Sequence, residues 1–333
     1  MIQLSIAFQS DKRLATYGAL AELVERYGFD TITVYEDLMF QPAWQPLLLM
    51  AQHTKRVHLG PAVVNPYLRH PAIIAGEIAL LNEAAQGRAY LGVGRGAFLQ
   101  TLHLEQEAPI TRVRETVEMV QRLLRGDRTP YEGRVFQATE EAYLRWEPPY
   151  REIPLLIGTW GPRMGALAGR VADEVKIGGC WNPDFVPLMR QYVARGAREA
   201  QRDPQEVGIC VGAVTVIDED RAAAEALARR EVAMYLPVVL RLDPTLQVAE
   251  QEAAAVVAAA ERGDADAAAT AISTETLRRL ACFGTPEDVV AQVEALAAAG
   301  ATRIEFGTPH GRDEAAAIRL LGERVLPYFE KEV

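Results

Sequence analysis

Short apolar runs rich in β-branched residues alternate with amphipathic helical stretches from one end of the chain to the other. This alternation is typical of repeated strand–helix units, in which helices cover a parallel sheet. Eight such runs are present, and eight parallel strands are the number that closes a barrel. The predicted strands are 2–8, 30–35, 57–64, 88–94, 153–158, 173–178, 206–216 and 302–307. We therefore predict an α/β fold, a (β/α)8 TIM barrel that occupies residues 1–333 as one domain.

The helical stretches carry their own start and stop signals. Between residues 14 and 28, apolar side chains recur at the helical period, and Gly28 follows as a stop signal. Near the C-terminus, Thr285 can cap a helix whose first position is taken by Pro286. The other predicted helices are 42–54, 71–85, 110–126, 161–171, 184–202, 286–299 and 312–328. Together with the strands, they complete the alternating pattern.

Two connections are longer than a compact barrel needs. Residues 97–150 follow the fourth strand and contain a predicted helix, a predicted hairpin and a proline-rich return. Residues 219–281 follow the seventh strand and are rich in alanine. In such barrels, the connections after the strands build the active-site face. We expect both insertions to form walls or a lid there.

Composition excludes several classes of function. The 35 basic and 45 acidic residues give a net charge of −10, and no basic cluster could follow a phosphate backbone, so no nucleic-acid partner is expected. No apolar run is long enough for a membrane span, and the first residues read as a strand, so we expect a soluble, cytoplasmic protein. Three scattered cysteines are too few for a disulfide frame or metal cluster; no metal is predicted.

The third predicted strand ends in unusual turn chemistry. It runs through "LGPAVVNPYLRHP", residues 59–71, where Pro61, Asn65–Pro66 and Pro71 interrupt a good strand. A plain strand-to-helix connection needs none of these residues. His70 stands at the start of the next helix, and we expect it to fix the loop and not to take part in chemistry.

The segment "IGTWGPRMGALAG", residues 157–169, indicates an anion site. The fifth strand ends at Gly158, Pro162 fits the first helical position, and Arg163 falls in the first turn. A cation there is poorly matched to the helix dipole, whereas an anion would draw together the free amides and the guanidinium. The pattern favours a phosphate site, and the alternative is a solvated arginine beside a turn.

Glycines follow the fourth strand in "GVGRGA", residues 92–97. The spacing is G-x-G-x-G, without the helix that a dinucleotide fingerprint requires, so a Rossmann site is not predicted. We interpret the segment as a strand end where backbone lies close to a flat ligand, with Arg95 nearby. A purely structural glycine turn is the alternative.

Titratable and aromatic side chains follow other strand ends. Glu36 and Asp37 come after the second strand, where one carboxylate could face the barrel mouth; alternatively, both solvate a loop or cap the next helix. His310 follows the eighth strand and could act as an acid or base at the mouth. Trp181 also follows a strand end and could cover a ring system or pack in the core.

Several of these segments together resemble a known family. They are "GPAVVNPYLRHPAIIA", "GRAYLGVGRG", "YEGRVF", "IPLLIGTWGPRMGALAGRVADEV" and "FGTPEDVVAQVEALAAAGATRIEFGTPHG". In this order, from the first strand to the last helix, they resemble the luciferase-like flavin and deazaflavin oxidoreductases. Within that group the chain is most similar to the branch of methylenetetrahydromethanopterin reductase.

The resemblance implies a cofactor at the C-terminal ends of the strands. It implies a bulge in the third strand, with a non-proline cis peptide at Ala62–Val63 behind the ring of the cofactor, and Asn65 beside it. The residues implied to hold the phosphate are Gly158, Thr159, Gly161, Pro162 and Arg163, and those implied to border the ring or its side chain are Gly94, Arg95 and Gly96.

One position departs from the family pattern. Family members often carry an acidic residue and then histidine after the second strand, whereas here Asp37 follows Glu36. Glu36 or Asp37 would therefore have to polarise or protonate a substrate. We expect the substrate to pass over Phe40 and Trp181, with His310 close by.

The function expected from the resemblance is that of an F420-dependent oxidoreductase. It would transfer a hydride between the deazaflavin C5 and a small organic substrate, with a methylenetetrahydromethanopterin-like molecule as one candidate. The alternatives are an FMN-dependent monooxygenase of the same superfamily and a flavin-binding protein without turnover. A homodimer or homotetramer is expected from the family.

Overall fold

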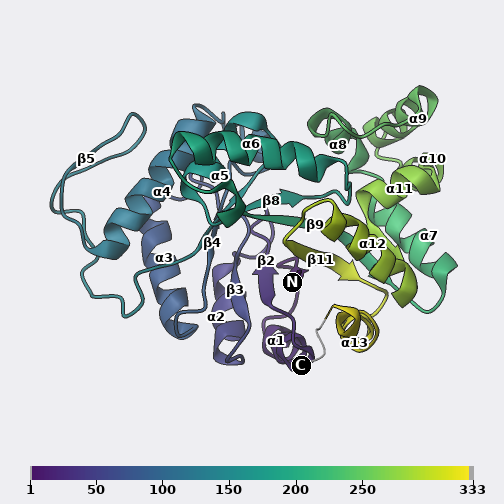
Figure 1. Ribbon diagram of the computed structural model, residues 1–333, viewed down its shortest axis with the longest axis horizontal. Coiled ribbons are helices and arrows are strands. Elements are labelled where there is room, and N and C mark those ends of the chain that lie inside the picture. Colours follow the sequence, from purple (N-terminus) through teal and green to yellow (C-terminus); the bar gives the residue numbers. More distant parts are fainter. Residues whose placement is uncertain (1, 330–333) are drawn as a thin grey trace.

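Eight parallel strands form a nearly closed barrel in the computed structural model, which describes residues 2–329 (Figure 1). Their order around the barrel is β3-β2-β1-β11-β9-β8-β7-β4. The bridges Leu59–Ala89 and Val64–Val93 join the two ends of this order. The predicted TIM barrel is confirmed. The strands are β1 (Gln3–Phe8), β2 (Thr31–Val34), β3 (His58–Pro61), β4 (Leu91–Val93), β7 (Leu155–Gly158), β8 (Glu174–Gly178), β9 (Gly208–Ile217) and β11 (Arg303–His310).

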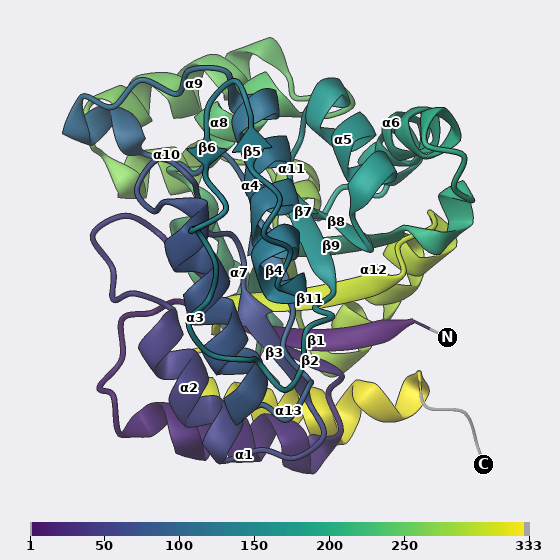
Figure 2. The same cartoon turned by 90° about the vertical axis from the view of Figure 1, so that its left-hand side faces the viewer.

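Helices surround the strands (Figure 2), and those that flank the barrel bury apolar faces against it. They are α1 (Thr16–Tyr27), α2 (Trp44–Gln52), α3 (Pro71–Ala84), α4 (Pro109–Arg125), α5 (Pro162–Val171), α6 (Phe185–Glu199), α7 (Arg221–Val232), α8 (Leu236–Leu242), α9 (Glu250–Glu261), α10 (Ala265–Ala271), α11 (Thr274–Leu280), α12 (Pro286–Ala298) and α13 (Glu314–Arg324). Three short 3-10 turns, Leu99–Leu102, Pro204–Glu206 and Leu326–Tyr328, complete the set.

Local sequence signals explain several helix boundaries. Gly28 adopts the left-handed conformation that ends α1, as predicted. Thr285 caps α12 and, with Asp288, forms a reciprocal capping box. The expected start of α1 was too early, because Leu14 lies before the helix and is 53% exposed.

One short strand was not predicted from the sequence. The short strand β10 (Cys282–Gly284) pairs in parallel with the far end of β9, just before α12. Three residues give too short a pattern to separate from the end of a helical region. The predicted hairpin in the first insertion is present as β5 (Tyr131–Glu132) and β6 (Gln137–Ala138).

The two insertions differ in how they attach to the barrel. The arm that carries β5 extends away from the barrel at the left of Figure 1, and the fully buried carboxylate of Glu115 holds it by accepting three backbone amides of residues 134–136. In the second insertion, α8, α9 and α10 group together in both views (Figure 1 and Figure 2). The first helix of this insertion, α7, packs against β9 and β10.

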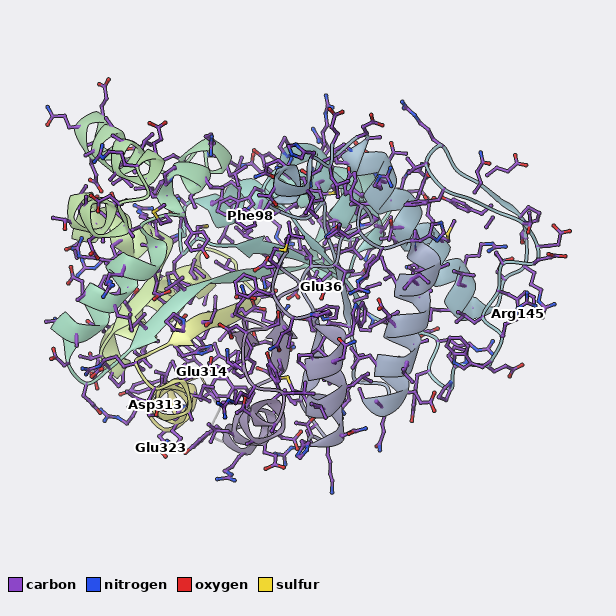
Figure 3. All side chains as sticks on the ribbon, turned by 180° about the vertical axis from the view of Figure 1, so that it is seen from behind. Glu36, Phe98, Arg145, Asp313, Glu314 and Glu323 are labelled. Carbon is purple, nitrogen blue, oxygen red and sulfur yellow. The ribbon has the colours of Figure 1, made fainter. Side chains whose placement is uncertain are left out.

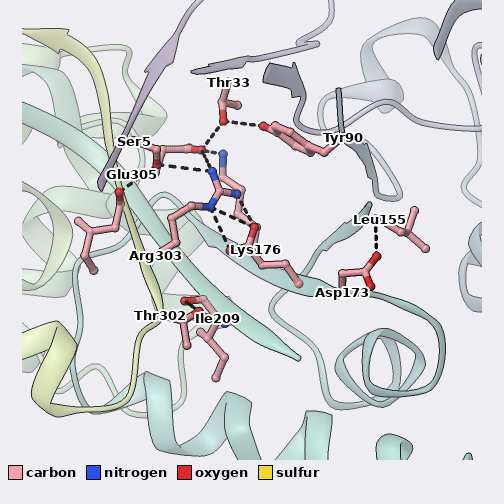
Figure 4. Close-up of polar contacts among 12 residues, drawn as sticks. Ser5, Thr33, Tyr90, Leu155, Asp173, Lys176, Ile209, Thr302, Arg303 and Glu305 are labelled. Carbon is pink, nitrogen blue, oxygen red and sulfur yellow. Dashed lines mark hydrogen bonds and ion pairs between the residues drawn. The ribbon is translucent and has the colours of Figure 1, made fainter. Parts of the chain in front are cut away.

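The barrel interior carries charges where branched aliphatic side chains are usual (Figure 4). Lys176 of β8 pairs with Glu305 of β11, and Arg303 of β11 pairs with Glu174 of β8. Thr33 of β2 donates to Glu305 across the lumen at 2.6 Å. Burial alone would raise the pKa of Glu305, but Lys176 and Arg303 outweigh it and hold the pKa below its ordinary value. The Glu305 carboxylate is therefore ionised, and each charged side chain of this network depends on its partner for compensation of its charge.

None of the helices described between residues 2 and 329 is long and apolar enough to cross a membrane. Over the same residues, no three or more His, Cys, Asp or Glu side chains come together as a metal site would require. All three cysteines are buried and unbonded to one another.

Candidate active site

A cavity of about 290 Å³ opens beside the C-terminal ends of β2 and β3. Its lining residues are Glu36, Asn65, Leu68 and Arg69. Two of them, Glu36 and Asn65, were expected from the sequence. Figure 3 shows Glu36 and Phe98 in the central part of the molecule, whereas Arg145 lies at its edge. The cavity is thus at the end of the barrel where enzymes of this fold place their active sites.

The third strand bulges at a cis peptide and then pairs again with β4 through Val64. The bond between Ala62 and Val63 is cis, as the resemblance implied. The Val63 side chain then fits between Gly94 and Gly158, since a Cβ at either glycine would lie 2.7 or 2.6 Å from a Val63 methyl. The backbone just before the bulge is equally close to β4, because a Cβ at Gly92 would lie 2.4 Å from the carbonyl oxygen of Pro61. These glycines make room for the bulge.

The turn after the bulge is held by Asn65. Its Oδ1 accepts hydrogen bonds from the backbone N–H groups of Tyr67 and Leu68, at 3.2 and 3.1 Å. The side chain is buried against Gly96, where a Cβ would lie 2.9 Å away. The turn chemistry of the sequence therefore builds one wall of the cavity.

The first insertion packs on the same turn. The Tyr67 hydroxyl donates to the carbonyl of Glu107 at 2.8 Å. The Arg112 guanidinium lies over the Tyr67 ring at 4.6 Å and over the Phe136 ring at 5.3 Å. His70 caps α3 by accepting from the backbone N–H of Ala72, which confirms its expected role in fixing the loop. The residues 65–70 thus connect the barrel to the insertion.

Both oxygens of the Glu36 carboxylate are engaged. Arg69 donates to Oε1 from Nε and Nη2, at 3.2 and 3.0 Å, and the backbone N–H of Ala43 donates to Oε2. Arg69 also pairs with Glu77 of α3 at 2.8 Å. Glu36 therefore joins the loop, α2 and α3, and this arrangement supports the alternative in which it caps the next helix. Arg69 was quoted in the turn motif but was not expected as its partner.

Asp37 is less constrained than Glu36. Its Oδ2 accepts from Gln9 Nε2 at 3.0 Å, and the side chain is half-buried. Burial and the carboxylates of Glu305 and Asp37 raise the pKa of Tyr35 well above its usual value. Partial burial and the charge of Asp37 also raise the pKa of Tyr235 in the second insertion. Among the described residues Asp37 thus has one hydrogen-bond partner, Gln9, whereas Glu36 has two.

An open cradle follows β7 at the same end of the barrel. Thr159 Oγ1 accepts from the N–H of Gly161 at 3.1 Å, and no side chain caps the N-terminus of α5. A Cβ at Gly161 would meet nothing within 4 Å. Arg163 is exposed and takes part in no ion pair of the described residues. Arg195 of α6 donates to the carbonyl of Pro162 at 3.1 Å, which adds a second guanidinium beside the cradle.

The remaining expected residues are dispersed. Phe40 is 46% exposed at the mouth and Arg95 is exposed on the loop after β4. Trp181 is only 1% exposed and stacks on Phe306, so its position does not support a role in substrate passage. His310 is fully buried; its Nε2 lies 3.1 Å from the carbonyl oxygen of Phe306, and its position does not support acid–base chemistry at the mouth.

The buried polar side chains in the barrel interior, below the candidate site, were not predicted from the sequence. Tyr35 lies with its ring 4.8 Å from Lys176 Nζ and its hydroxyl 3.4 Å from Glu305 Oε1. The available signal was the two charged residues in each of the strands "EVKIG" and "RIEFG", because a charge in a buried strand must find a partner.

Comparison with known proteins agrees with this arrangement. Residues 3–303 match the luciferase-like monooxygenase family. A 5,10-methylenetetrahydromethanopterin reductase of Methanolobus tindarius is 31% identical over 92% of this chain and 94% of that protein. An F420-dependent glucose-6-phosphate dehydrogenase of Nakamurella multipartita is 28% identical over 92% of this chain and 90% of that protein.

A solved structure is also similar to this chain. The coenzyme F420-dependent tetrahydromethanopterin reductase of Methanopyrus kandleri superposes with a TM-score of 0.91 and 28% identity, over 99% of both chains. The protein therefore belongs to the luciferase-like monooxygenase family.

Proposed function

We propose that this protein is an F420-dependent oxidoreductase that transfers a hydride to or from a small organic substrate. The observation that carries the proposal is the open cradle at Gly161–Arg163, at the same end of the barrel as the Ala62–Val63 bulge. An uncapped helix N-terminus and a free guanidinium suit a phosphate group. The F420-dependent relatives named above support the choice of cofactor.

The residues of this chain fit such a cofactor. The amides at the start of α5, with Arg163, would hold its phosphate. The Val63 backbone and Asn65 would back its ring, since the bulge is fixed by close packing against Gly94 and Gly158. When bound, F420 supplies the carbon that carries the hydride. The protein supplies orientation and excludes water.

Proton transfer in the site is best assigned to Asp37. Glu36 already accepts hydrogen bonds from Arg69 and Ala43 on both oxygens, so protonating it would break an ion pair that joins three elements. Asp37 has a single polar partner, Gln9, and stands at the mouth. We infer that Asp37 holds or moves the proton and that Glu36 keeps the loop in place.

The substrate would lie under an apolar rim. Large apolar side chains are exposed on the loops after β2, β4 and β9: Met39, Phe40, Phe98, Met234, Tyr235 and Val238. Such a rim suits a substrate with a flat or apolar body. A methylenetetrahydromethanopterin-like substrate is consistent with the rim and with the reductases among the relatives.

Titration of the purified protein with F420 and with FMN tests the cofactor. We expect saturable F420 binding, seen as a change in cofactor fluorescence, and FMN binding weaker by at least tenfold. Tight FMN binding without F420 binding would contradict the proposal and favour a flavin monooxygenase.

Two substitutions in the cradle give a sharper prediction. Arg163→Ala should weaken F420 binding about tenfold or more, because a charge-assisted contact to the phosphate is lost. Gly161→Ala should also weaken it, because its Cβ would enter the open space that the phosphate requires. Neither should lower the melting temperature appreciably, since Arg163 is exposed and the new Cβ meets no protein atom.

Arg198→Ala is the matched control, an exposed arginine near the end of α6. It should leave F420 affinity unchanged. Unchanged affinity in both Arg163→Ala and Gly161→Ala would rule out the cradle as the phosphate site.

A further inference from the structure

A second pocket lies at the opposite end of the barrel from the candidate active site. Its volume is about 160 Å³, and it surrounds the C-terminal end of α4, where Arg125, Arg128, Arg151, Tyr143 and Trp146 line it. The chain enters β7 four residues after Arg151, whereas the cofactor cradle follows the other end of β7. Figure 3 shows Arg145, on the same arm, far from Glu36. We call this site the arginine pocket.

One arginine of the pocket is held against an aromatic ring. The guanidinium of Arg128 lies 3.7 Å from the centre of the Tyr143 ring, which also lines the pocket. Arg145, outside the lining, contacts the same ring at 4.0 Å and donates from Nη2 to the carbonyl of Glu141 at 3.3 Å. Cation–π contact thus holds the Arg128 charge at the pocket wall.

The positive charges of the pocket are poorly compensated. In the part of the chain that the structure describes, no ion pair includes Arg125, Arg128 or Arg145. Arg151 lies 3.5 Å from Glu147, whose side chain is 93% exposed. The carboxylate of Asp127 is nearby and accepts from Thr129. The dipole of α4 explains an arginine at Arg125, the last helical residue, but not those outside the helix.

A buried arginine holds the segments that line the pocket. Arg122 is 5% exposed and donates to the carbonyls of Thr129 and Ala142, at 2.6 and 3.3 Å, so it joins the two segments that carry Arg128 and Tyr143. The side chains that line the pocket are therefore carried on a fixed backbone.

We propose that the arginine pocket binds a phosphate-bearing small molecule, with nucleoside diphosphates as the ligand class. Guanidinium groups match phosphate oxygens in charge and in planar geometry. The indole of Trp146, 45% exposed in the pocket wall, provides a face on which a base stacks. A concentration of arginines in a chain of net charge −10 is thereby explained as a local binding site.

Calorimetric titration with pyrophosphate and with ADP tests the proposal. The titrations use an Arg163→Ala background, so that the cofactor cradle does not contribute. Both ligands should bind, and Arg128→Gln or Arg151→Gln should weaken both about tenfold. Arg198→Gln is the control and should change neither. Failure of both ligands to bind, or equal weakening by Arg198→Gln, would overturn the proposal.

A further variant distinguishes binding of a nucleotide from binding of a phosphate group alone. Trp146→Ala should weaken ADP binding several-fold and leave pyrophosphate binding unchanged, because only the nucleotide has a ring to stack. Equal binding of ADP by the variant and the parent would overturn the assignment of nucleotides. All of these variants alter exposed side chains, and their melting temperatures should match that of the parent protein.

Discussion

Replacing Lys176 by methionine should destabilise the protein by about 3–5 kcal/mol, because the carboxylate of Glu305 would remain buried without its main counter-charge. Lys176 is 5% exposed and Glu305 is fully buried, and the two form an ion pair inside the barrel. Thr33 and Arg303 would still contact Glu305, but neither replaces the close ammonium. Urea unfolding, followed by circular dichroism, measures the loss.

Two further variants make this expectation specific. Lys55→Met removes an exposed lysine and should change the free energy of unfolding by no more than about 0.5 kcal/mol. The double variant Lys176→Met/Glu305→Leu replaces the pair with apolar groups and should recover at least half of the loss. A single Lys176→Met variant within about 1 kcal/mol of the parent would show that the ion pair is not needed.

The same pair gives a pH dependence with a definite sign. The pKa of Glu305 is lowered in the folded protein from an ordinary value of 4.5. Its contribution to stability is therefore fully present above pH 4.5 and is lost as the pH falls through the lower folded value. Without Lys176 the folded pKa rises, so acid unfolding of Lys176→Met should begin at a higher pH than in the parent.

Adding a methyl group to Gly92 of β4, or to Gly94 just after it, should disrupt the bulge at Ala62–Val63. Gly92→Ala places a Cβ 2.4 Å from the Pro61 carbonyl oxygen, and Gly94→Ala places one 2.7 Å from a methyl group of Val63. Overpacking of this kind costs about 1–3 kcal/mol, and the backbone clash at Gly92 should lie at the upper end. Both changes should also weaken F420 binding, since they displace the wall behind the proposed ring position.

A second substitution, at Val63, distinguishes the effects of the two glycine variants. Val63→Ala removes the methyl group that Gly94→Ala would meet, so Val63→Ala should restore stability to Gly94→Ala but not to Gly92→Ala. Gly161→Ala is the stability control, because its Cβ would enter open space. Thermal unfolding measures stability, and F420 fluorescence titration measures binding. Rescue of both variants, or of neither, would contradict this account of the packing.

Patterns among neighbouring residues predicted much of the fold and the end of the barrel at which the candidate site lies. Alternation of strand and helix patterns gave the barrel, and Gly28, Thr285 and Pro162 marked helix ends correctly. The Gly158–Arg163 turn was also recognisable, because a missing cap and a misplaced cation are features of consecutive residues. The short strand β10 was missed, since three residues carry almost no periodicity.

Periodic burial and turn propensity are properties of neighbouring residues, so the order of the elements, the end of the barrel that carries the candidate site and the turn that forms its wall could be predicted from the sequence. Which side chains meet depends on the folded barrel. Glu36 is held by Arg69, 33 residues away, and Lys176 by Glu305, 129 residues away. Trp181 follows the end of β8 and His310 is the last residue of β11, yet both are buried. Their contacts depend on how the strands close into a barrel, and no pattern of neighbouring residues specifies that geometry.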